Sequence, residues 1–278
     1  KMSQGAIGVF DSGIGGLSVL RAIRTLIPAQ DVLYFGDQGH VPYGPRPMSE
    51  VRRFSFAISQ FLIEQGAQLI VVACNTASAA ALIDLRLAFA DMPFVGMEPA
   101  VKPAAEQTQT AKVGVLATPA TFQGALYASV VERFAQGVEI YQDTCTGLVQ
   151  EIEAGRLDGP ETRQILNQAL QPMLQAGIDT VVLGCTHYPL VIPQIQSICG
   201  PQVRVIDPAP AVARQTERLT GQISLQPRQG GSTTYFTSGD PQALRPLMGI
   251  FQAPPGRIQA VSWQADFSIS VSASAPQI

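Results

Sequence analysis

Charged residues are scarce in this sequence of 278 residues, where they make up 14%, against roughly 25% in an average soluble domain. A surface so poor in charge indicates that part of it is buried against a partner chain. The net charge is −3 and the lysines and arginines form no cluster, so we expect no nucleic-acid partner. No apolar run approaches the roughly 18 residues that cross a membrane, so we expect no membrane span.

Residues that bind metals are also few. The two histidines, His40 and His187, lie far apart, and the four cysteines form no CxxC pair. Zinc sites usually combine closely spaced cysteines and histidines, so we expect no metal. Hydrophobic residues, in contrast, make up 46% of the chain, which excludes disorder over most of its length.

Only three lysines occur, Lys1, Lys102 and Lys112, and none stands in a motif-like segment. A pyridoxal-phosphate enzyme needs a Schiff-base lysine, so we do not expect that cofactor. The first residues lack the basic segment and apolar run of a secretory signal. Unpaired cysteines without such a signal predict a cytoplasmic protein.

Short apolar runs alternate with amphipathic stretches along the chain. Non-alternating runs rich in β-branched residues are typical of buried parallel strands. One stretch, 49–64, predicts a helix with Ser49 as N-cap and one apolar face. This alternation predicts an α/β fold of doubly wound parallel sheets. The predicted strands are 7–10, 32–35, 69–73, 94–97, 113–117, 138–141, 180–184 and 203–206.

The sequence contains an internal repeat. The segment QGAQLIVVACNT (65–76) aligns without gaps on AGIDTVVLGCTH (176–187), which places Cys74 on Cys185. Two further segments, IGVFDS and Glu98-Pro99-Ala100, have counterparts in the same order at a nearly constant offset. Buried strands resemble one another by chance, but chance does not explain the matched glycines, cysteines and acid-Pro-Ala triplets. We therefore predict two related α/β halves, roughly residues 7–98 and 113–206.

The predicted first domain is discontinuous. It comprises residues 1–98 and 208–278, and the second domain comprises residues 99–207. In the tail, apolar spacing predicts helices at 211–219 and near 241–251, and we expect this segment to pack on the first domain. The last residues, SASAPQI, have a composition typical of disorder.

Ligands of parallel sheets bind outside the carboxyl ends of the strands. Cys74 and Cys185 each follow a predicted strand, so two related domains that face each other would oppose the two thiols across a cleft. Inversion of a stereocentre by proton transfer needs a base on one face of the carbon and an acid on the other. A cysteine thiol suits this task because its pKa, near 8.5, can be tuned by its neighbours.

The other two cysteines, Cys145 and Cys199, have no counterpart in the repeat, and we interpret them as small buried side chains. The segment DSGIGGLS (11–18) predicts a turn that opens a helix, whose amides could hold an anion, a carboxylate or a phosphate. A tight strand–helix turn without a ligand is the alternative. The segment is neither GxGxxG nor a P-loop.

Six segments together resemble the glutamate racemases of the cofactor-independent aspartate/glutamate racemase superfamily, from about residue 6 to about residue 215. The resemblance implies two similar α/β domains with the active site between them, a dimer and no cofactor. It also implies the interconversion of L- and D-glutamate for peptidoglycan synthesis. The segments are DSGIGGLSV (11–19), GDQGHVPYGPR (36–46), VVACNTAS (71–78), GMEPA (96–100), VGVLATPAT (113–121) and LGCTHYPLV (183–191).

The resemblance also implies roles for individual residues. Cys74 would take the α-proton of D-glutamate and Cys185 that of L-glutamate. Asp11 matches an acid near the first cysteine, and His187 and Glu153 match groups near the second, although Glu151 stands close enough in sequence to compete. The implied substrate-binding residues are Asp11, Ser12, Tyr43, Gly44, Asn75, Thr76, Thr118, Thr121, Thr186 and His187.

Two departures from the family pattern are Gln38-Gly39-His40, where a basic residue is common, and Thr146, where proline is common. The tail from about residue 220 resembles nothing we can place. Alternative functions are a racemase for aspartate or another amino acid, and a protein on the same scaffold that binds amino acids without catalysis. Binding of nucleic acid or of a protein partner is a more distant alternative.

Overall fold

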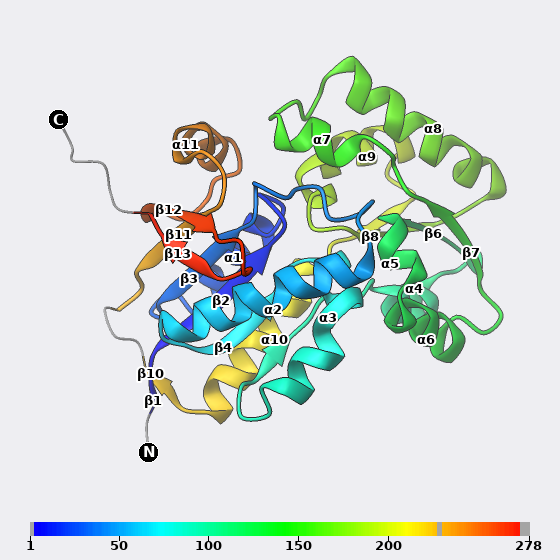
Figure 1. Cartoon of the computed structure of the whole chain (residues 1–278). Helices are drawn as coiled ribbons and strands as arrows, with labels where there is room; N and C mark the ends of the chain where they lie inside the picture. Colours follow the sequence, from blue (N-terminus) through cyan, green and yellow to red (C-terminus); the bar gives the residue numbers. More distant parts are fainter. Residues whose placement is uncertain (1–2, 227–229, 273–278) are drawn as a thin grey trace.

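The computed structural model describes residues 3–226 and 230–272. It contains two large sheets flanked by helices, whose strands are parallel except for one antiparallel edge strand of the larger sheet (Figure 1). All eight predicted strands are confirmed, with ends that differ by at most two residues. Strands of the larger sheet, in spatial order, are β13 (Ile269–Val271), β12 (Arg257–Trp263), β11 (Thr233–Thr237), β3 (Val32–Gly36), β2 (Ala6–Asp11), β4 (Ala67–Val72) and β5 (Phe94–Val95).

The smaller sheet repeats the order of the larger one. A short third pairing joins β1 (Ser3–Gln4) to β10 (Leu225–Gln226). Each strand β7, β6, β8 and β9 occupies the place of β3, β2, β4 and β5, respectively, and this equivalence confirms the two predicted α/β halves. The smaller sheet contains, in spatial order, β7 (Glu139–Asp143), β6 (Lys112–Ala117), β8 (Thr180–Gly184) and β9 (Arg204–Ile206).

Helices cover both faces of the two sheets (Figure 1). They are α1 (Leu17–Leu26), α2 (Met48–Glu64), α3 (Asn75–Ala88), α4 (Val101–Gln107), α5 (Pro119–Gln123), α6 (Ala125–Phe134), α7 (Leu148–Glu153), α8 (Pro160–Ala176), the 3-10 turn η1 (Tyr188–Val191), α9 (Ile192–Cys199), α10 (Ala209–Gln222) and α11 (Pro241–Ile250).

Helix α2 begins earlier than predicted. Its N-cap is Pro47, and Ser49 lies inside the first turn, so the expectation that Ser49 caps this helix was wrong. Proline lacks an amide hydrogen and has a fixed φ, so the chain can turn into a helix directly after it at no cost in hydrogen bonds. The predicted apolar face is buried: Val51, Phe54, Ile58, Phe61 and Leu62.

The C-terminal tail packs on the first sheet, as predicted. Strand β11 pairs in parallel with β3, and α10, which contains the predicted helix at 211–219, packs against α1. Figure 1 shows the last strands, in orange and red, beside β3. The predicted disorder of SASAPQI falls on residues 272–278. Of these, 273–278 lie outside the described residues, and only Ser272 is described. The predicted domain boundaries at 98/99 and 207/208 remain a prediction.

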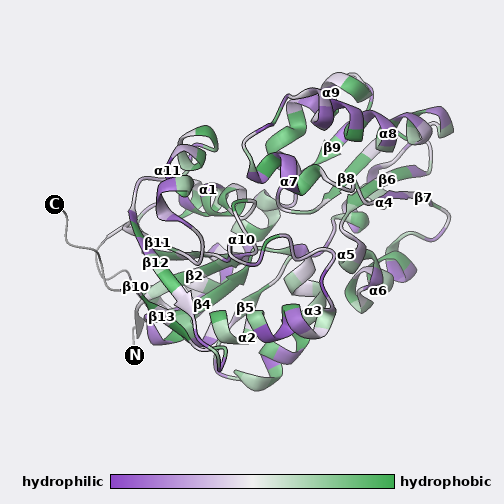
Figure 2. Cartoon of the chain, turned by 45° about the horizontal axis from the view of Figure 1, so that its top comes forward, coloured by the Kyte–Doolittle hydropathy of each residue, from purple (hydrophilic) through white to green (hydrophobic). Residues whose placement is uncertain are grey.

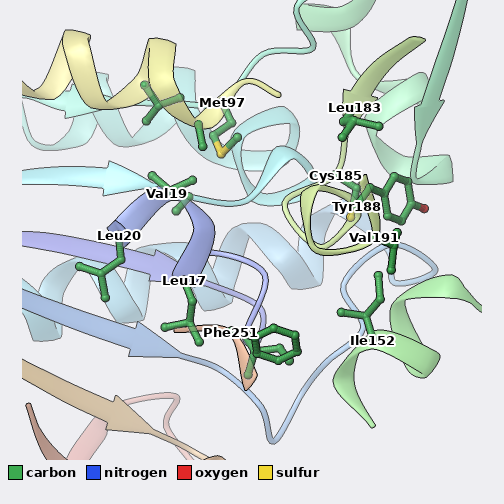
Figure 3. Packing of buried hydrophobic residues seen from close by; sticks show 14 of the residues in the cluster. Leu17, Val19, Leu20, Met97, Ile152, Leu183, Cys185, Tyr188, Val191 and Phe251 are labelled. Atoms are coloured by element: carbon green, nitrogen blue, oxygen red, sulfur yellow. The ribbon is translucent and has the colours of Figure 1, made fainter. Parts of the chain in front are cut away.

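Apolar residues, in green, are frequent along the strands, whereas the helices alternate between apolar and polar residues (Figure 2). One buried cluster runs from α1 to the end of β8, so it joins elements of both sheets. Figure 3 shows that cluster near Cys185, which lies among Leu183, Tyr188 and Val191. Within the part of the chain that the structure describes, no helix is long and apolar enough to cross a membrane.

Candidate active site between the two sheets

A small enclosed pocket lies where strands of the two sheets end. Its volume is about 10 Å³, which is room for one water molecule. Both predicted proton-transfer cysteines line it, one from each sheet. The lining residues are Ser12, Pro42, Tyr43, Gly44, Cys74, Asn75, Thr76, Thr118, Val149, Cys185, Thr186 and His187.

Cys74 follows β4 and caps the N-terminus of α3. Its Sγ accepts a hydrogen bond from the amide of Ala77 at 3.4 Å. This helix end favours a thiolate. Burial and the negative charge of Asp11 act in the opposite direction and raise the pKa of Cys74 well above its usual range. The resting state of Cys74 is therefore the neutral thiol.

Cys185 follows β8 and stands in a chain of polar groups. Its Sγ lies 3.8 Å from Nδ1 of His187, and Nε2 of His187 lies 2.6 Å from Oε1 of Glu153. Burial disfavours the imidazolium, but the contacts with Cys185 and Glu153 outweigh burial and raise the pKa of His187 well above its usual value. His187 is therefore a cation near neutral pH, and its positive charge lies beside the Cys185 sulfur.

The two candidate acids of α7 have different partners. Glu153 binds His187 and also accepts the amide hydrogen of Ile14 at 2.8 Å. Glu151 instead forms two hydrogen bonds with Arg156, at 2.7 and 2.8 Å. Of the two acids, Glu153 rather than Glu151 therefore contacts the pocket residue His187.

Asp11, the last residue of β2, is fully buried. One carboxylate oxygen accepts the amide of Gly16 at 2.9 Å, and the other accepts the hydroxyl of Thr186 at 3.2 Å. Burial raises its pKa despite the nearby positive charge of His187. Asp11 therefore links the first sheet to the loop that carries Cys185.

The amides of the segment DSGIGGLS bind two carboxylates of the protein itself. Gly13 and Gly16 donate to Asp11, and Ile14 donates to Glu153. These three amides are therefore occupied by side chains of the protein, which fits the alternative of a tight strand–helix turn. Glycine is required here because a Cβ on Gly13 would overlap Glu153, and a Cβ on Gly15 would overlap His187.

Hydroxyl groups join the two sheets on the other side of the pocket. Oγ1 of Thr118 lies 2.8 Å from Oγ1 of Thr76 and 2.9 Å from Oγ1 of Thr121. Thr121 thus lies behind Thr118 and does not line the pocket. The amide nitrogen and oxygen of the Asn75 side chain are buried without a hydrogen-bond partner. Buried polar atoms left unpaired in this way are costly, so they indicate a place for a polar ligand.

Two pocket residues were not predicted. Pro42 stands next to the predicted pocket residue Tyr43 in the VPYG turn, so this motif could have indicated it. Val149 lies on α7, and its apolar side chain carried no signal in the sequence. Among the described residues, no group of three His, Cys, Asp or Glu side chains is arranged to hold a metal ion.

The fold and the two free cysteines, Cys74 and Cys185, define a class of α/β enzyme with one thiol on each side of a pocket. The sequence matches the Asp/Glu/Hydantoin racemase family over residues 7–216, and the chain belongs to this family. It is a racemase, and hence an isomerase.

Several proteins similar to this chain are glutamate racemases. The enzyme of Roseiflexus sp. (strain RS-1) is 48% identical over 256 residues, which are 91% of this chain and 94% of that protein. The Escherichia coli glutamate racemase, solved with L-glutamate and the activator UDP-MurNAc-ala, has a TM-score of 0.82 at 31% identity and covers 94% of this chain and 99% of its own. The Francisella tularensis glutamate racemase, solved with D-glutamate, has a TM-score of 0.81 at 28% identity, covering 93% and 97%.

Proposed function

We propose that this protein interconverts L- and D-glutamate by proton transfer between Cys74 and Cys185. The observation that carries the proposal is one pocket lined by two cysteines from equivalent strand ends. The names of the relatives, and the L- and D-glutamate bound in two solved structures, support glutamate as the substrate.

In the direction from L- to D-glutamate, Cys185 is the base. Its thiolate, paired with the His187 cation, takes the α-proton, and the electron pair remains on the α-carbon and its carboxylate. The Cys74 thiol then donates its proton to the opposite face of that carbon. Cys185 ends as a thiol and Cys74 as a thiolate, so protons and charge balance. The reverse reaction exchanges the two roles.

The remaining residues hold the substrate. Asn75 offers one amide donor and one acceptor without partners in the protein, and these suit a carboxylate and an ammonium group. Asp11 and Thr121 do not line the pocket and instead hold Thr186 and Thr118 by hydrogen bonds. The proposed contacts, beside Asn75 itself, are Ser12, Tyr43, Gly44, Thr76, Thr118, Thr186 and His187.

A pocket of about 10 Å³ cannot admit glutamate, so the molecule must open to bind it. We propose that residues 1–98 and 208–278 move as one domain against residues 99–207. The chain crosses between these domains only twice under this division. We further propose that the protein forms a homodimer, acts in the cytoplasm without a cofactor, and supplies D-glutamate for peptidoglycan.

Proton NMR of L-glutamate in D2O with purified protein tests the substrate. We expect loss of the α-proton signal together with decay of optical rotation, and at most slow exchange of aspartate. Cys74→Ala and Cys185→Ala should each lower racemisation by about 1000-fold or more. Binding of glutamate without exchange would instead favour a catalytically silent binding protein. Faster exchange of aspartate than of glutamate would make the protein an aspartate racemase.

A further inference from the structure

A buried carboxylate outside the proton-transfer chain links the C-terminal tail to the pocket. Asp37 directly follows β3 and is fully buried. Its amide donates to the carbonyl oxygen of Asp11 at 3.0 Å, so its backbone is fixed to the end of β2. Neither the sequence motifs nor the proposed mechanism assigns a role to Asp37.

Four side chains surround the Asp37 carboxylate as hydrogen-bond partners. Oδ2 accepts the Tyr43 hydroxyl at 2.5 Å, and Oδ1 accepts the Ser238 hydroxyl at 2.6 Å and Nε1 of Trp263 at 2.9 Å. Nδ1 of His40 lies 3.0 Å from both oxygens. Two of these partners belong to the pocket loop 38–46 and two belong to the tail.

The tail makes further hydrogen bonds and ring contacts with the pocket loop. The hydroxyl of Thr237 donates to the side chain of Gln38 at 2.6 Å, and the amide of Gly39 donates to Ser238 at 2.9 Å. The His40 ring stacks on Phe54 of α2 with centroids 4.2 Å apart and meets the Trp263 ring edge-on at 5.2 Å. The tail therefore fixes one side of the loop that presents Tyr43 and Gly44 to the pocket.

The bond to Asp37 also determines what Tyr43 can offer a substrate. A phenolic hydroxyl has a single hydrogen, and that of Tyr43 is donated to Asp37. Burial and the Asp37 charge raise the pKa of Tyr43 well above its usual value, so the hydroxyl keeps this hydrogen. Tyr43 thus contributes its ring and backbone to the pocket, and their position depends on Asp37.

We propose that Asp37 is a positioning residue for substrate binding, and that Trp263 and Ser238 of the tail hold it in place. The inference rests on the proposed function because it concerns the same pocket. Both proton-transfer cysteines stand on other loops. Loss of the Asp37 bonds should therefore weaken substrate binding more than it slows proton transfer, which raises KM with little change in kcat.

The test compares two variants that each remove one hydrogen-bond donor from the tail. Trp263→Phe removes the bond to Asp37, whereas Tyr235→Phe removes a bond to the carbonyl oxygen of Pro254. For Trp263→Phe we expect KM for glutamate to rise about fivefold or more with kcat within about twofold, and for Tyr235→Phe no change in KM. Asp37→Asn should raise KM further. Thermal unfolding of each variant shows whether it folds.

Trp263 is the only tryptophan, so its emission gives a readout that is independent of turnover. Glutamate should change this emission in the wild-type and Tyr235→Phe proteins and not in Asp37→Asn. The inference is overturned if Trp263→Phe has the same KM as the wild type, or if KM rises equally in both Phe variants. In either case, racemisation by the wild type would still support the proposed function. Wild-type protein that neither binds nor racemises glutamate overturns both.

Discussion

At the scale of single residues, the two cysteines differ in their electrostatic surroundings. Cys74 faces the carboxylate of Asp11, whereas Cys185 faces the cation of His187. Negative charge thus lies beside Cys74, and positive charge lies beside Cys185. This asymmetry has a consequence for the pH dependence of the enzyme.

Asp11→Asn should move the basic limb of the kcat/KM profile to lower pH. Activity falls at high pH when both thiols are ionised, and in the wild type this is delayed because burial and Asp11 raise the pKa of Cys74. Removal of the Asp11 charge stabilises the Cys74 thiolate, so that pKa falls. The profile of Thr121→Ser, which keeps the Asp11 charge, should retain the wild-type limb. A basic limb that stays in place in Asp11→Asn would contradict this account.

His187 should stabilise the fold in a pH-dependent way. Its folded pKa lies above the unfolded value of about 6.5. Its contribution to stability is therefore fully present below pH 6.5 and is lost as pH rises through the folded pKa. We expect urea denaturation to show a larger loss of unfolding free energy in His187→Gln at pH 6 than at pH 9. A loss that is the same at both values would show that the His187 pKa is not raised.

At the scale of elements, helix α7 provides a matched pair of carboxylates. Glu153→Gln removes the charge beside His187, and Glu151→Gln removes the partner of Arg156 on the same helix. We expect kcat/KM to fall about 10- to 100-fold in Glu153→Gln and to change less than about twofold in Glu151→Gln. Steady-state kinetics of the two variants, once each is shown to fold, measure this difference. Equal effects would mean that Glu153 acts only through the stability of α7.

The sequence repeat and the apolar runs predicted eight strands of the two sheets, because buried strands and their ends follow from local composition. Strands β1, β10, β11, β12 and β13 were not predicted. They also placed Cys74 and Cys185 at equivalent ends. The role of the amides around Ile14 was not predictable, because they bind Glu153, which is 139 residues away. The same holds for Asp37, whose partner Trp263 is 226 residues away. Such contacts depend on how the elements pack, which local patterns do not encode.

At the scale of the whole molecule, the structure is closed around its pocket. The two halves touch closely where Gly124, between α5 and α6, meets Ala79 of α3. Gly124→Leu should hold the halves apart and lower kcat/KM about tenfold, because the proton-transfer groups would be misplaced. Gly221→Leu is the matched control, since nothing lies within 4 Å of a Cβ at Gly221. Full activity of Gly124→Leu, measured by steady-state kinetics, would show that this contact does not matter for closure.

The central claim is that two thiols act on opposite faces of the α-carbon. Early turnover of L-glutamate in D2O, followed by mass spectrometry of the separated enantiomers, tests it most directly. We predict that the first D-glutamate formed carries deuterium at the α-carbon while the remaining L-glutamate keeps its hydrogen. D-glutamate that retains the substrate hydrogen would show that one group moves the proton across both faces, and it would contradict the two-cysteine mechanism.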